Sequence, residues 1–183
     1  MAKFKILRTA TAVLSLTGCT GVIVNDSPGP RASYFTGDFE YATNLGAIVT
    51  QVVGNPFDIP PETFRTAVLN LMQGHTRDGS ARFVAAPTNQ TILPYKVVAA
   101  FDMPPWVDGY VLCKGAASLP APVKLPGETT LGIAFCFGDQ LKSDANGSVS
   151  GARSIDDPRF VALVQRVTEA MLPAREDSGP DAQ

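Results

Sequence analysis

The stretch 131–145, LGIAFCFGDQLKSDA, decides the fold of this chain. Its first half alternates bulky and small side chains, which is typical of a β-strand with one face on a core. The bulky residues are Leu131, Ile133, Phe135 and Phe137. Gly138 can adopt a positive φ, so Gly138-Asp139 is a good two-residue hairpin turn. The chain is therefore expected to fold back as an antiparallel strand from Leu141 as far as Asn146-Gly147.

Further strands are expected on both sides of this hairpin in the sequence. Residues 95–101 show the same alternation of side chains. Three shorter apolar segments complete the expected sheet, and these are Ile48–Val53, Arg82–Ala86 and Tyr110–Lys114.

Two amphipathic helices are predicted from apolar residues spaced three and four positions apart. The first stripe is Phe64, Ala67, Val68, Leu71 and Met72. The second stripe is Phe160, Leu163, Val164, Val167 and Met171. Pro61 suits the first turn of the first helix, and Gly74 suits its C-terminal cap. Asp156 or Asp157 can cap the second helix, in which Pro158 takes the first turn.

The order of these elements predicts an α+β fold. We expect a mainly antiparallel sheet of about five to six strands, with the two amphipathic helices packed on one face. A doubly wound α/β sheet is disfavoured, because the strands expected after residue 80 lack intervening helices.

The N-terminus combines three cations with a short apolar run. Lys3, Lys5 and Arg8 precede the run Thr9–Leu16, which is too short to span a membrane but suits an export signal. The residues Leu16-Thr17-Gly18-Cys19 resemble the bacterial lipobox, in which a small residue precedes a cysteine that is lipidated and becomes the new N-terminus. The alternative is a buried helix or strand that ends in Gly-Cys.

The lipobox resemblance implies a diacylglycerol on the sulfur of Cys19 and usually a third acyl chain on its amine. Two or more chains anchor a protein stably in a lipid bilayer. Thr20 follows the cysteine, where the enterobacterial sorting pattern has Asp for inner-membrane retention. The protein is therefore expected in the bacterial cell envelope facing the periplasm, with the outer membrane favoured over the inner.

Four parts of the chain follow from this interpretation. Residues 1–18 are the expected signal peptide, and residues 19–36 are the lipidated cysteine with a flexible tether rich in turn formers. Residues 37–172 are expected to form one periplasmic domain. The polar residues 173–183 are expected to be a disordered tail.

The charge of the chain argues against nucleic acid as a partner. The signal contains three of the 15 Lys and Arg and none of the 17 Asp and Glu. The remainder is therefore acidic and has no basic block, whereas binding to phosphates requires clustered cations.

Two cysteines remain outside the signal. Cys113 and Cys136 are an even pair in an exported protein, which favours a disulfide. Two buried free thiols are the alternative. A bridge would lie on the small-residue face of the 131–137 strand and tie residues 110–114 to the hairpin. A metal site is not expected, because the single histidine and scattered acids supply no ligand spacing.

Sequence patterns for common chemistry are absent. Gly147–Gly151 has valine where the nucleophile of G-x-S-x-G would stand, and the chain has no phosphate loop and no Rossmann glycine pattern. His75 follows the expected end of a helix, where a cation complements the helix dipole. The sequence therefore predicts no catalytic residue and no cofactor.

The loop Met103-Pro104-Pro105-Trp106 contains the only tryptophan. An aromatic on a rigid loop is a good contact anchor, so Trp106 and Pro105 are candidate partner contacts. The alternative is that Trp106 folds back over a sheet end. Together, the connection Val52–Phe57 and the Phe-Cys-Phe-Gly-Asp hairpin resemble uncharacterised proteobacterial envelope proteins, a resemblance that implies no activity.

These observations favour a non-enzymatic, membrane-anchored envelope lipoprotein. It would present a small domain to an envelope protein or help an assembly. An envelope hydrolase or ligand-binding enzyme with an unrecognised site is the first alternative, and it predicts a pocket with perturbed titratable groups. A structural spacer of the envelope is the second.

Overall fold

A six-stranded mixed sheet forms the centre of the protein. The computed structural model describes residues 21–26, 36–76, 79 and 81–172. The strand order is β1-β6-β5-β4-β2-β3. The strands are β1 (Val22–Asp26), β2 (Ala47–Val53), β3 (Arg82–Val84), β4 (Thr91–Phe101), β5 (Glu128–Phe137) and β6 (Gln140–Ser150).

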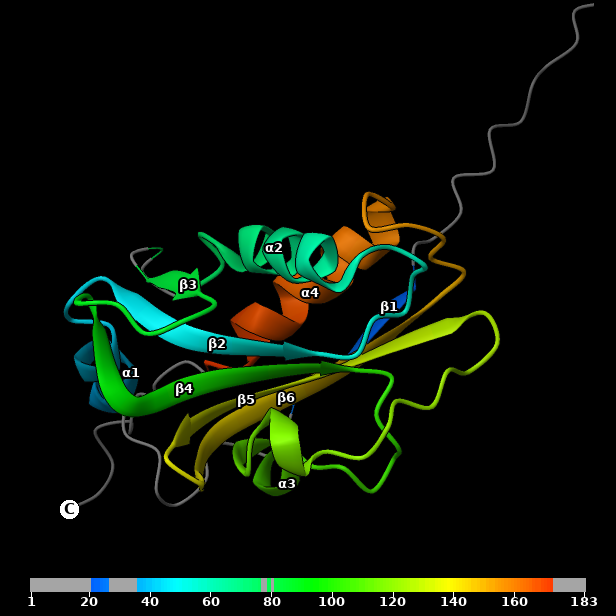
Figure 1. Cartoon of the computed structure of the whole chain (residues 1–183). Helices are drawn as coiled ribbons and strands as arrows, with labels where there is room; N and C mark the ends of the chain where they lie inside the picture. Colours follow the sequence, from blue (N-terminus) through cyan, green and yellow to red (C-terminus); the bar gives the residue numbers. More distant parts are fainter. Residues whose placement is uncertain (1–20, 27–35, 77–78, 80, 173–183) are drawn as a thin grey trace, which may run out of the picture.

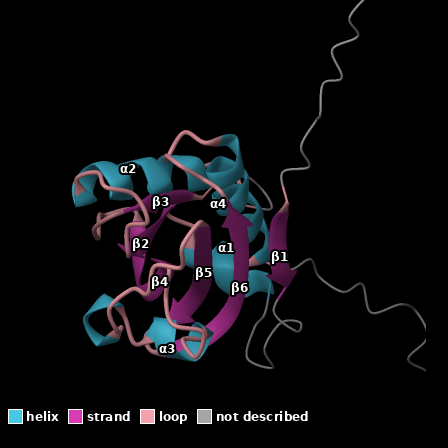
Figure 2. Ribbon diagram, turned by 90° about the vertical axis from the view of Figure 1, so that its right-hand side faces the viewer, coloured by secondary structure: helices cyan, strands magenta, loops and turns pink. Residues whose placement is uncertain are grey.

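Helices cover both faces of this sheet. The helices are α1 (Thr36–Ala42), α2 (Pro61–Met72), α3 (Gly109–Cys113), the 3₁₀ turn η1 (Ala116–Ser118) and α4 (Pro158–Ala170). Figures 1 and 2 show α2 and α4 side by side on one face and α3 on the other. The α+β class predicted from the sequence is therefore confirmed, with a third layer added by α3.

The predicted hairpin is present. β5 ends at Phe137 and β6 begins at Gln140, and these two residues are paired across the turn. Gly138 in the turn has a φ of 58°. β6 does not stop at Asn146-Gly147 but continues to Ser150.

The prediction of a mainly antiparallel sheet is wrong. β2 pairs parallel with β3 on one side and with β4 on the other, while β4, β5, β6 and β1 pair antiparallel. The parallel pairs arise because α2 returns the chain from the last residue of β2 to the end of the sheet at which β2 starts. β3 and β4 can then run in the same direction as β2, as parallel strands require. The crossover lies before residue 80, whereas the absence of intervening helices holds only for the strands after that residue.

The main core lies between the sheet and the helices α1, α2 and α4. α2 buries Phe64, Val68, Leu69 and Met72. α4 buries Phe160, Leu163, Val164, Val167 and Thr168. A second, smaller core under α3 contains Val98, Ala100, Leu112, Cys113, Ala134, Cys136 and Leu141.

The segment 110–114, predicted as a strand, is helical. Asp108 caps α3, because its Oδ1 accepts a hydrogen bond from the backbone N–H of Val111 at 3.0 Å. This cap gives an acceptor to one of the unpaired N–H groups at the helix start, and Asp is one of the residues preferred at this position. The short apolar run Tyr110–Cys113 has no period that would have separated a helix from a strand.

The segment predicted as a flexible tether contains an ordered strand. β1 pairs antiparallel with β6, with Val22 opposite Val149 and Asp26 opposite Ala145. The folded unit therefore begins at β1 rather than at residue 37. The predicted signal peptide, Cys19, residues 27–35 of the tether and the tail 173–183 lie outside the described residues.

Asp157 rather than Asp156 caps α4. Its Oδ1 accepts hydrogen bonds from the backbone N–H and the Nε of Arg159, both at 3.0 Å, and its Oδ2 lies 2.8 Å from Nη2 of the same residue. These bonds hold the pKa of Asp157 well below its ordinary value, because they favour the ionised carboxylate. The cap fixes the connection between β6 and α4.

Candidate functional site

The two ends of the sheet carry different surfaces. One end of the sheet contains the first residues of β1 and β5 and the last residues of β4 and β6. Val22 and Thr129 both pair with Val149, which aligns the starts of β1 and β5 with the end of β6. Phe101 at the end of β4 pairs with Leu131 near the start of β5. We call this end of the sheet the Val22 end. The turn between β5 and β6 lies at the opposite end, which we call the hairpin end (Figure 1).

A hollow of about 360 Å³ opens at the Val22 end on the face covered by α3. The loop between β4 and α3 and the segment 119–127 form its walls, and β5 and β6 form its floor. Its apolar lining is Ala100, Met103, Pro104, Pro105, Val107, Leu112, Val123, Leu125, Leu131, Gly132 and Gly147. The backbone N–H of Val123 donates to the carbonyl of Asp102 at 2.6 Å, which ties the two walls together.

Large apolar side chains around this hollow are exposed. Trp106 is 64% exposed, Val123 50% and Leu125 46%. Trp106 lies between Pro105 and Val107, which both line the hollow. The alternative that Trp106 closes over the sheet end as a buried lid does not fit this exposure.

β1 adds a fourth apolar residue to the same surface. Val22 and Val24 pack against the main core, so Ile23 between them points to the opposite face of the sheet. Ile23 is 61% exposed, and its partner in β6, Ser148, lines the hollow. We call the four residues Ile23, Trp106, Val123 and Leu125 the Val22-end patch.

Asp102 holds the loops of this patch on the sheet. It is 3% exposed and has a φ of 53°, in the left-handed region that few residues other than Gly, Asn and Asp adopt. Its N–H donates to the carbonyl of Thr130 at 3.0 Å, and its Oδ1 accepts from the N–H of Thr130 at 2.9 Å. Burial raises the pKa of its carboxyl, although the Thr130 N–H and the charge of Lys124 oppose the shift.

Two substitutions of Asp102 should distinguish the contribution of its hydrogen bond to stability from the contribution of its charge. Asp102→Asn keeps an acceptor for Thr130 and tolerates the positive φ, so its stability should stay within about 1 kcal/mol of the parent at pH 7. Asp102→Ala leaves the Thr130 N–H without this acceptor and should cost about 1–3 kcal/mol. Urea unfolding followed by circular dichroism measures both.

The pH dependence of the same pair tests the raised pKa. A carboxyl whose pKa is higher in the folded state stabilises the fold most below its unfolded value, and this contribution is lost as pH rises through the folded value. Asp102→Asn should therefore gain stability relative to the parent between pH 4 and pH 7. Parallel stability curves for the two proteins would contradict this account.

A second exposed apolar cluster lies at the hairpin end. Tyr41 is 59% exposed, Leu93 62% and Phe137 38%. The rings of Tyr41 and Phe137 both pack edge-on against the buried Tyr95, at centroid distances of 6.0 and 4.9 Å. The N–H of Gly138 donates to the carbonyl of Pro94, next to Leu93, at 3.1 Å. We call Tyr41, Leu93 and Phe137 the hairpin-end patch.

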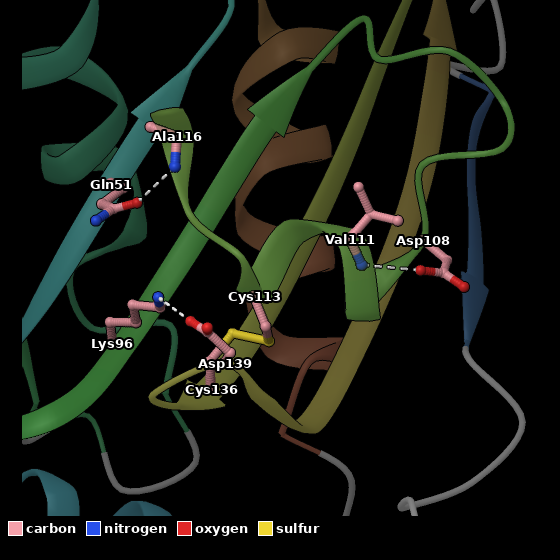
Figure 3. The surroundings of a disulfide bond; sticks show 8 residues. All are labelled: Gln51, Lys96, Asp108, Val111, Cys113, Ala116, Cys136 and Asp139. Atoms are coloured by element: carbon pink, nitrogen blue, oxygen red, sulfur yellow. Dashed lines mark hydrogen bonds and ion pairs between the residues drawn. A yellow bond between two sulfur atoms is a disulfide. The ribbon is translucent and has the colours of Figure 1, made fainter. Parts of the chain in front are cut away.

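The disulfide predicted between Cys113 and Cys136 is present, with a Cα–Cα distance of 5.6 Å. Figure 3 shows it joining the end of α3 to β5. Both cysteines are fully buried in the small core under α3, on the small-residue face of β5 as predicted. Nearby, the Ala116 N–H donates to Gln51 Oε1 at 3.0 Å, and Lys96 Nζ lies 3.6 Å from Asp139 Oδ1 (Figure 3).

A second hollow of about 270 Å³ adjoins Asp102 on the other side of the loops. It contains the carboxylates of Asp58 and Glu128 and the cations Lys124 and Arg153. Among the described residues, its lining has no serine, cysteine or histidine that could serve as a nucleophile or base beside Asp102. The carboxyl of Asp102 accepts a hydrogen bond from the Thr130 N–H, so it has a structural role.

The side chain of His75 has an acidic partner on another helix. Nδ1 of His75 lies 2.7 Å from Oε1 of Glu169, so it connects the end of α2 to α4. Within the described ranges, no group of three His, Cys, Asp or Glu side chains could hold a metal ion. In the same part of the chain, no helix is both long and apolar enough to cross a membrane.

The structure brings some predicted residues together and leaves others apart. Cys113 and Cys136 are joined, whereas Trp106 and Pro105 lie at the rim of a hollow that no sequence pattern predicts. Ile23, Val123 and Leu125 were missed as its neighbours. The signal for the last two was in the sequence, because Val123-Lys124-Leu125 lies between Pro122 and Pro126 where no strand could bury them.

Comparison with known proteins identifies no family. No family model matches the chain, and no curated protein matches it. Solved structures that resemble it include the PelC dodecamer from Paraburkholderia phytofirmans, at 12% identity and a TM-score of 0.44 over 84% of this chain and 100% of that one. A variant of that dodecamer in a different crystal form gives 13% identity and a TM-score of 0.42 with the same coverage. Similarity at this level carries no argument about the function of this chain.

Proposed function

We propose that the protein is a non-enzymatic lipoprotein of the bacterial cell envelope, anchored through acyl chains on Cys19, that binds a protein partner through the hairpin-end patch. The lipobox-like residues Leu16–Cys19 support the anchor. The observation that carries the binding function is the exposure of Tyr41, Leu93 and Phe137 at the end of the sheet opposite the start of β1.

The place of this patch suits a protein partner. A domain held at a membrane by its N-terminus keeps its opposite end accessible to proteins in the periplasm. Aromatic side chains are enriched at the centres of protein interfaces, where they contribute much of the binding free energy. Tyr41 and Phe137 are already held by packing on Tyr95, so their immobilisation on binding costs little entropy.

Crosslinking in intact cells tests the partner. A photoreactive phenylalanine analogue in place of Tyr41 should give one discrete adduct with a protein. The same analogue in place of Tyr110, which is 52% exposed on α3, is the matched control and should not give that adduct. Phe137→Asp should reduce the Tyr41 adduct about tenfold, because it places a charge in the apolar contact.

The remaining outcomes oppose the proposal. Equal adducts from positions 41 and 110 would mean that contact is unspecific. If neither position gives an adduct in a correctly anchored protein, the result would favour a structural spacer of the envelope. The anchor is checked separately by mass spectrometry of the mature N-terminus, and Cys19→Ala should move the protein from the membrane fraction to the aqueous fraction.

A further inference from the structure

We infer that the Val22-end patch rests in the headgroup layer of the bilayer that carries the lipid on Cys19. The membrane surface, rather than a protein, would cover Ile23, Trp106, Val123 and Leu125. This inference rests on the proposed function, because it requires the anchor at Cys19. It adds which surface of the domain faces the membrane and assigns Trp106 to lipid.

The reach of the chain determines which end lies at the membrane. Only Thr20 and Gly21 separate Cys19 from the first residue of β1. Three residue steps span at most about 11 Å whatever their conformation. β1 is hydrogen-bonded into the sheet, so a lipid on Cys19 brings the Val22 end against the headgroups. The hairpin end is out of reach, because the eleven residues of β6 extend about 35 Å.

The chemistry of the patch fits a membrane interface. Tryptophan is enriched at the headgroup level, since its ring is apolar while its N–H can be hydrated. Ile23, Val123 and Leu125 add aliphatic surface beside it. Lys124 can lay its apolar stem along this surface and direct its ammonium group to lipid phosphates.

The loops of the patch are fixed before any contact with lipid. Asp102 binds Thr130 through both its N–H and its carboxylate, and its carbonyl accepts from Val123. The segments on both sides contain prolines, and these are Pro104, Pro105, Pro120, Pro122 and Pro126. A rigid apolar surface loses little conformational entropy on contact.

Fluorescence of Trp106 tests the inference directly, because it is the only tryptophan of the chain. The acylated full-length protein would be reconstituted in vesicles of phosphatidylethanolamine and phosphatidylglycerol. We expect quenching of Trp106 by acrylamide to fall about threefold relative to the Cys19→Ala protein free in solution, and its emission to shift to shorter wavelength. Lipids brominated on their acyl chains should quench it.

A tryptophan at the other end is the matched control. The double variant Trp106→Phe, Tyr41→Trp places the single tryptophan at a site of similar exposure in the hairpin-end patch. Its acrylamide quenching should be the same on vesicles and in solution, and brominated lipids should not quench it.

The failures of the two proposals are distinguishable. If the protein purified from membranes has no acyl chain on Cys19 and does not float with vesicles, the proposed function fails. If it floats but Trp106 stays as accessible to acrylamide as in solution, the inference alone is overturned. Protection of Trp106 in native envelopes but not on protein-free vesicles would assign the patch to a protein and equally overturn it.

Discussion

Phe160→Ala is expected to lower the free energy of unfolding by about 3–5 kcal/mol, in the range found for large-to-small changes in cores. Phe160 is fully buried, and its ring lies 4.9 Å from that of Phe57, 5.6 Å from that of Phe101 and 6.1 Å from that of Phe64, between centroids. These rings come from the β2–α2 loop, from β4 and from α2. One side chain therefore joins α4 to three other parts of the fold.

The size of the effect follows from what can fill the gap. The neighbouring rings are rigid and come from different elements, so they cannot collapse onto an alanine without moving the helices. Phe160→Leu keeps much of the volume and should cost about 1–2 kcal/mol. Urea unfolding should be followed by circular dichroism, because Trp106 is exposed in a loop and reports poorly on this core.

A surface residue is the control for this series. Val123→Ala removes an aliphatic side chain that is 50% exposed, so its stability should change by about 0.5 kcal/mol or less. A loss for Phe160→Ala no greater than that for Val123→Ala would mean that α4 does not pack on the sheet as described.

The elements predicted correctly are those whose signals are local. The helix over 61–72 is recognisable from apolar residues three and four positions apart and from a proline at its start. The 131–145 hairpin is recognisable from alternating bulky and small side chains and from Gly138 in the turn. β1 could not be recognised, because its strand character depends on pairing with β6, which lies more than 100 residues away. The parallel pairing of β2 with β4 is equally non-local.

The candidate surfaces show the same limit. Trp106 and Pro105 were predicted as contacts because a rigid loop with an aromatic is visible in the sequence. The Val22-end patch also needs Ile23, which reaches it only through the register of β1 with β6. The hairpin-end patch combines residues from α1, β4 and β5, so no single segment carries its pattern.

Removal of the disulfide through Cys113→Ala, Cys136→Ala is expected to cost about 3 kcal/mol. The two cysteines are 23 residues apart, and the bridge lowers the conformational entropy of the unfolded chain. For a loop of this length the lost entropy corresponds to about 3 kcal/mol of stability at 25 °C. Alanine is preferred to serine because both positions are fully buried among apolar side chains, where a hydroxyl would lack a partner. Chemical reduction of the parent should give the same stability as the double variant.

The loss should be local as well as global. α3 has five residues, too few to be stable without tertiary contacts, and the bridge joins its last residue to β5. Amides of α3 should therefore exchange faster with solvent in the double variant, while those of β4 and β5 stay protected.

The loops that carry Trp106 and Val123 flank α3 on either side. We expect Trp106 to lose its fixed position in the double variant, with a lower fluorescence anisotropy at pH 7. Equal stability and equal exchange in α3 with and without the bridge would show that the small core holds this helix unaided.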